Sequence, residues 1–107
     1  MFAGELRHMI KIEKPTYGRG TSGGKTVTWT KVAEVWAAIE PIRGREYIEA
    51  QKVASEITTR IRIRHRSDLK PNMRVEHLST GELYEIVSVI PIRTMGSELH
   101  LMCKAVV

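Results

Sequence analysis

Residues 43–66, "RGREYIEAQKVASEITTRIRIRHR", change their hydrophobic period halfway along, and this change decides the fold class. In the first half, apolar residues recur at spacings of three and four: Tyr47, Ala50, Ala54 and Ile57. This spacing predicts an amphipathic helix over residues 44–56, about three turns long. A helix this short is marginal by itself in water, so we expect it to pack on a sheet.

The second half of the stretch alternates with a period of two, which predicts a half-buried strand. We expect Ile57, Thr59, Ile61, Ile63 and His65 on the inner face. The outer face then carries an arginine at every second position, and we call Arg60, Arg62, Arg64 and Arg66 the arginine ladder. Two residues of strand rise place neighbouring ladder side chains roughly 7 Å apart.

Like charges at this spacing lower stability unless something neutralises them. Three sources of neutralising charge are open: cross-strand carboxylates such as Glu76 or Glu85, an acidic face of another subunit, or phosphates. The alternative is a solvated face whose charges prevent stray strand pairing.

The rest of the chain supplies further strands around this stretch. "ELRHMIKIEK" alternates, with Leu6, His8, Ile10 and Ile12 on one face. "VAEVWAAIE" predicts a strand with Val35, Ala37 and Ile39 inward and Trp36 opposite. "MRVEHL", "LYEIVSVIPI" and "LHLMCKAVV" complete about six strands. We therefore predict a mainly β protein: a six-stranded antiparallel barrel or sandwich with one helix, forming a single domain over residues 1–107.

Residues 14–25, "KPTYGRGTSGGK", contain four glycines and a proline, which predicts a long glycine-rich hairpin loop without regular structure. Loops of this length in compact domains are usually functional or mobile. The segment ends in "GGKT", but a phosphate-binding loop needs a glycine where Arg19 stands and a helix afterwards. Since a strand follows, we do not expect nucleotide binding.

Composition limits the remaining functions. The 107 residues carry a net charge of +5 and a pI near 9.7, which favours acidic partners such as nucleic acid, an anionic surface or an acidic protein face. The one cysteine, Cys103, lies in an apolar strand and is expected in the core. The histidines lack metal-ligand spacing, and no catalytic set is recognisable. We expect no cofactor, no metal, no enzymatic activity and no membrane span, in a protein folded in the cytosol.

Nearly the whole chain resembles the bacteriophage head–tail joining proteins, also called head-closure, head-completion or stopper proteins. The resemblance rests on "AGELRHMIKIEKP", on "TWTKVAEVWAAIEPIRGREYIEAQKVASEITTRIRIRHR", and on "MRVEHL", "GELYEIVSVIP" and "LHLMCKA". It implies a small β-barrel with a helix, in a phage or prophage protein made in the bacterial cytoplasm. It also implies a place in the virion neck, in a ring of twelve or six copies. There the ring would keep packaged DNA in the head, with the portal or adaptor on one side and the tail or tail-completion protein on the other.

Two groups of residues are candidates for contacts in such a ring. The arginine ladder could meet acidic helix residues of a neighbouring copy, or double-stranded DNA passing transiently through the channel; the acidic candidates are Glu46, Glu49 and Glu56. The glycine-rich segment could reach a neighbouring ring or occlude the channel, through Tyr17, Gly18, Arg19, Gly20, Thr21, Ser22, Gly23 and Gly24. The alternatives are an OB-like barrel that binds single-stranded nucleic acid and a tail-side completion protein of similar fold.

Overall fold

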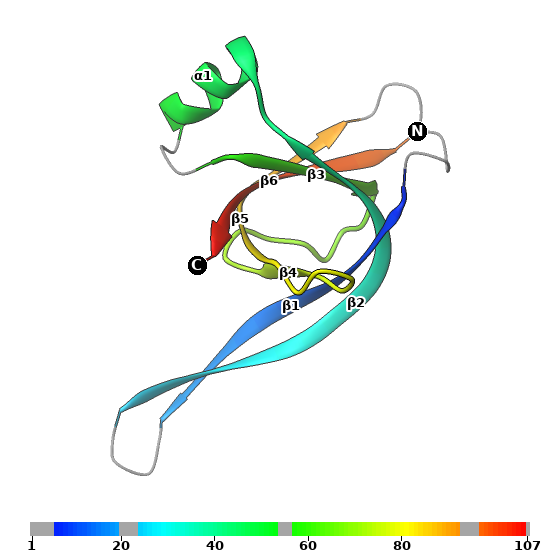
Figure 1. Cartoon of the computed structure of the whole chain (residues 1–107). Helices are drawn as coiled ribbons and strands as arrows, with labels where there is room; N and C mark the ends of the chain where they lie inside the picture. The colour runs from blue at the N-terminus through cyan, green and yellow to red at the C-terminus, as the bar shows by residue number, and fades with distance from the viewer. Residues whose placement is uncertain (1–5, 20–23, 54–56, 93–96, 107) are drawn as a thin grey trace.

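The computed structural model describes residues 6–19, 24–53, 57–92 and 97–106. Along the chain its elements are β1 (His8–Arg19), β2 (Lys25–Pro41), α1 (Gly44–Val53), β3 (Thr59–Arg64), β4 (Arg74–His77), β5 (Leu83–Ile92) and β6 (Glu98–Val106). The strands form one closed barrel in the order β1-β2-β3-β6-β5-β4, and every pairing is antiparallel (Figure 1). The mainly β prediction is confirmed, and the barrel is the architecture adopted.

Alternating side chains of the strands fill the barrel interior. The largest fully buried ones are aliphatic, and they include Ile10 and Ile12 of β1, Ile61 and Ile63 of β3, and Leu101 of β6. Trp36 points outward as predicted, while Ala37 is buried and Val35 and Ile39 pack against the core. Cys103 is also fully buried, and this burial raises the pKa of its thiol well above the ordinary value. The cysteine is therefore a core residue, as expected.

The helix packs on the outside of the barrel through a narrow face. Ala50 of α1 and Ile57 join Ile42 and Met102 of β6 in a second, smaller apolar cluster. Tyr47, predicted on the packed face, is instead 41% exposed, and Ala50 is the one residue of α1 in this cluster. The helix is described as far as Val53, and the predicted positions Ala54 and Glu56 lie outside the described residues.

Much of the predicted glycine-rich loop is strand, so that prediction was wrong in its bounds. Residues 14–19 belong to β1 and pair in register with β2, from Lys14↔Thr30 to Arg19↔Lys25. The β-branched run Thr26, Val27 and Thr28 explains this, since such residues strongly favour extended pairing. Pro15 is tolerated because β1 pairs with β2 alone at this point, and proline in sheets is found mainly on such edge strands. Residues 20–23 lie outside the described part.

This paired extension forms an arm, defined as residues 14–19 of β1 and 25–30 of β2. A register shift between Ile12 and Glu13 marks its root. β1 pairs with β4 only from Ile10 to Glu13, and β2 pairs with β3 only from Ala38 to Pro41. Beyond those pairings the two strands pair only with each other among the described strands, and they project far from the barrel (Figure 1). The molecule is consequently 50 Å long but under 30 Å wide.

The arginine ladder is one residue shorter than the sequence pattern predicts. β3 ends at Arg64, so His65 and Arg66 lie in the segment that follows, and His65 is exposed rather than inward. Arg66 bends back to Asp68, with 3.1 Å from its Nε to Oδ1 and 2.9 Å from Nη2 to Oδ2. Arg66 therefore makes a local bidentate pair with Asp68 and does not continue the row of outward-facing arginines along β3.

Candidate assembly surface

Arg60 and Arg62 are neutralised by carboxylates of the same chain. Arg60 donates to Glu40 Oε1 on the neighbouring strand β2, with 3.1 Å from Nε, and also pairs with Glu46 of α1. Arg62 places Nε 3.4 Å from the same Glu40 oxygen and Nη1 3.9 Å from Glu98 Oε1 on β6. A chain of alternating charges therefore runs from the helix across the outer face of β3.

The expected partners Glu76 and Glu85 do not take part in this chain of charges. β3 lies between β2 and β6, so carboxylates on β4 and β5 are not its neighbours. Glu76 instead pairs with Lys11 of β1, at 3.1 Å, and Glu85 with Lys104 of β6, at 2.9 Å. Neutralisation across the sheet was the right physical expectation, but the carboxylates named for it were wrong.

The described structure leaves Arg64 and Glu49 with no such partner. Arg64 is exposed at the end of β3 and makes no ion pair with any described residue. Glu46 is occupied by Arg60, and Glu56 lies outside the described residues. Glu49 is exposed on α1 and makes no ion pair within the described part of the chain. Of the six charged candidates that the structure describes, these two remain available to a partner.

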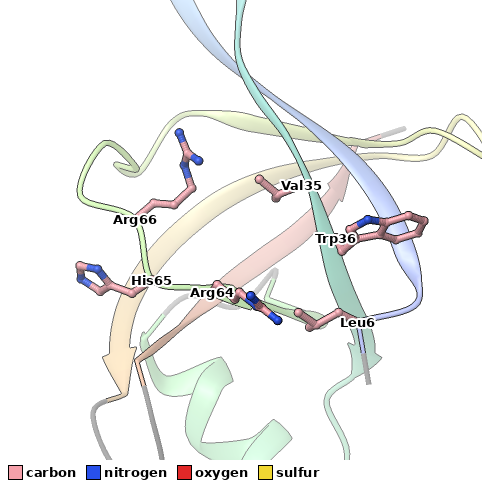
Figure 2. A pocket seen from close by; sticks show the side chains of 6 residues that line it. All are labelled: Leu6, Val35, Trp36, Arg64, His65 and Arg66. Carbon is pink, nitrogen blue, oxygen red and sulfur yellow. The ribbon is translucent and has the colours of Figure 1, made fainter. Parts of the chain in front are cut away.

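Arg64 lies on the wall of a groove of about 600 Å³. The groove forms where β3 stops pairing with β2, since the last paired residues are Arg62 and Ala38. Leu6, Val35 and Trp36 give it an apolar side, and Arg64, His65 and Arg66 give it a basic side (Figure 2). Trp36 points away from the barrel in Figure 2 and is 54% exposed.

Glu49 lies on the rim of a second, smaller hollow of about 310 Å³ between α1 and the strands β5 and β6. Its apolar lining comes from Ala50, Ile57, Ile90, Ile92 and Met102, and its polar lining from Glu46, Glu49, Arg60, Ser88 and His100. Ile90 is 42% exposed there. Neither depression was expected from the sequence, although the outward Trp36 on a strand was a signal for the first.

The arm presents an apolar face as well. Tyr17 and Val27 lie opposite each other in the register, and both are exposed, Tyr17 at 68%. At the root of the arm the guanidinium of Arg74 lies 4.3 Å from the centre of the Trp29 ring and donates to Glu13, at 2.8 Å. These contacts tie the arm to β4. Gly18 and Gly24 are described, Arg19 is described for its backbone alone, and Gly20, Thr21, Ser22 and Gly23 lie outside the described residues.

Within the described ranges, no three histidine, cysteine or acidic side chains gather as a metal site would require. No helix there is long or apolar enough to span a membrane. Fold and surface together define a class of protein: a small, basic, closed β-barrel with a projecting arm and several shallow depressions, among them the basic groove and the hollow that Glu49 borders.

Comparison with known proteins identifies the family. Residues 1–106 match the model of the phage head completion proteins, and the chain belongs to this family. It is 31% identical over 107 residues to the head completion protein gp7 of Enterobacteria phage HK97, covering 97% of this chain and 96% of that protein. The chain is thus a virion component from a structural family that is not an enzyme family.

Two solved structures share the fold. A protein of Shigella flexneri 2a, whose structure was determined in solution, superposes with a TM-score of 0.78 at 26% identity. The match covers 98% of this chain and 96% of the Shigella chain. A chain in the virion of a native gene transfer agent particle superposes with a TM-score of 0.63 at 19% identity. The match covers 95% of this chain and 96% of the chain from the particle. The second likeness concerns the fold alone.

Proposed function

We propose that copies of this chain form a ring in the neck of a tailed phage, between the portal or adaptor and the tail. The ring closes the head after DNA packaging and offers the tail its docking surface. The observation that carries this proposal is the family match over residues 1–106, to proteins named for completing the head. The arm supports it, because a long hairpin with exposed Tyr17 and Val27 can reach a neighbouring ring or the channel.

The charges favour contacts with protein over a tight grip on DNA. Arg60, Arg62 and Arg66 are neutralised by Glu40, Glu46, Glu98 and Asp68, so few cations on this face remain for phosphates. DNA affinity grows with the number of phosphates that a protein neutralises. A channel that releases DNA at infection requires weak contacts of this kind. Any contact of the ring with double-stranded DNA is therefore transient.

An OB-like barrel that binds single-stranded nucleic acid is the second candidate, and the exposed Trp36 beside Arg64 is the observation that favours it. Such proteins stack successive bases on several aromatic rings along a basic groove. The described groove offers one aromatic ring. Binding of short oligonucleotides that weakens steeply with salt would support this candidate, and its absence favours the neck ring.

Loss of the protein from an infection tests the proposal. The encoding phage, with this gene inactivated, should accumulate heads that have packaged DNA but lack tails and leak DNA. Adding the purified protein to an extract of such heads and separate tails should restore infectious particles. Infectious tailed particles formed in normal number without the protein would contradict the role. Restoration only when the protein is added to tails before heads would instead indicate a tail-side completion protein.

A further inference from the structure

The groove and the hollow lie at separate places on the barrel surface, and both border β3. Trp36 belongs to β2 and Ile90 to β5, and these strands are three places apart in the closed order of six. The exposed apolar residues of the two surfaces, Trp36 and Ile90, therefore project from strands that are not neighbours. Along β3 the two regions also separate, since Arg60 borders the hollow and Arg64 the groove.

The two surfaces complement each other in charge and polarity. The groove joins exposed apolar surface at Trp36 to the basic Arg64. The hollow joins exposed apolar surface at Ile90 to the acidic Glu49, and about 310 Å³ is enough space to receive a side chain of a partner. Arg64 and Glu49 are also the two candidates without an ion-pair partner among the described residues.

We propose that the edge of the groove on one copy packs into the hollow of the next copy, so that Trp36 contacts Ile90 and Met102 and Arg64 pairs with Glu49. This inference rests on the ring proposed above and names its subunit contact. Two different surfaces of one subunit make a head-to-tail contact, which closes into a ring when the rotation between copies fits. A buried aromatic anchor beside a charge pair is the usual centre of such an interface.

A charge exchange tests the pairing. Arg64→Glu alone and Glu49→Arg alone should each lower the yield of infectious particles about tenfold or more, because like charges then meet at the contact. The double variant should recover most of the yield. Lys70→Glu, which reverses an exposed cation outside the groove, is the matched control and should leave the yield unchanged. Single variants as infectious as the control, or a double variant no better than the singles, would overturn the pairing.

Cross-linking tests the contact itself. Because Cys103 is buried, a cross-linker that reacts with thiols reaches the engineered cysteines and not this one. Particles that carry Trp36→Cys and Ile90→Cys in one chain should yield a ladder of covalent multimers with a short bis-maleimide. The pair Trp36→Cys and Val106→Cys is the control, because Val106 is similarly exposed but lies at the end of β6 remote from the hollow. Monomers alone, from particles that contain the protein, would refute the contact and leave the neck role standing. Absence of the protein from particles would refute both.

Discussion

At the scale of residues, evenly spaced arginines have different roles. Arg60 and Arg62 hold α1, β2 and β6 to β3 through Glu46, Glu40 and Glu98. Arg64, two residues further along the same face, has no such partner among the described residues and borders the groove. The three arginines are evenly spaced, but Arg60 and Arg62 belong to a structural charge network, whereas Arg64 is left available for assembly.

Replacing Arg62 should cost far more stability than replacing Arg64. Arg62→Ala leaves the partly buried carboxylates of Glu40 and Glu98 without that cation, which we expect to lower the free energy of unfolding by about 1–3 kcal/mol. Arg64→Ala removes an exposed side chain and should change it by less than about 0.5 kcal/mol. Urea unfolding followed by circular dichroism measures both. Equal losses would contradict the separation of roles.

Tyr84 should make stability fall in alkaline solution. Burial, together with its hydrogen bond to Glu82 Oε2 at 2.6 Å, raises the pKa of Tyr84 from 10.0 to about 12. The unfolded chain then loses this proton at a lower pH than the folded chain does. The contribution to stability is complete below pH 10.0 and is lost as the pH rises to about 12.

We expect this loss to reach about 1–2 kcal/mol, measured by urea unfolding at pH values from 9 to about 12. Tyr84→Phe cannot ionise and should remove this part of the slope. The variant loses the hydrogen bond to Glu82 at every pH, so its slope rather than its absolute stability is the quantity to compare. An unchanged slope in the variant would show that other groups cause the loss.

At the scale of elements, the arm touches the barrel at its root, through Arg74 and Trp29, and its outer part extends beyond the barrel. The barrel closes through β1–β4 pairs at Ile10–Glu13 and β2–β3 pairs at Ala38–Pro41, and the arm begins beyond the first of these. Its exposed face, with Tyr17 and Val27, contributes little to the core. Such a face in a virion component is suited to contact with another protein.

Shortening the arm separates folding from assembly. Deleting residues 17–27 and joining the paired residues Thr16 and Thr28 by an Asn-Gly turn should leave the free energy of unfolding within about 1 kcal/mol, because none of the described side chains removed is buried. The same variant should fail to join tails or to retain DNA. Circular dichroism checks folding, and counts of tailed, DNA-filled particles check assembly. Normal particles from a variant that folds would contradict a role for the arm.

The period of the sequence predicted most of these elements. Alternation identified β3 with Ile61 and Ile63 inward, and the spacing around Ala50 identified the helix. The arm was missed because glycine and proline imply irregular structure locally, whereas here the pairing partner with Thr26, Val27 and Thr28 imposes the strand. The groove and the hollow depend on where β3 leaves β2 and where α1 meets β5 and β6. Those distances follow from tertiary packing, which no local pattern encodes.

At the scale of the whole molecule, closure of the barrel limits how copies can associate. Closing the sheet leaves few free edges, so association by added strands is largely prevented outside the arm. The proposed contact therefore uses side chains of two different surfaces of the barrel, with the arm free to reach a different ring. Under this account, ring closure and connection along the neck use separate parts of the same small chain.

The most direct test of this account is electron cryo-microscopy of the neck in particles of the encoding phage. We predict a closed ring of copies of this chain between the portal or adaptor and the tail, with neighbouring barrels in contact and each arm directed toward another ring or the channel. Particles in which the chain is absent from the neck, or present there without ring symmetry, would contradict it.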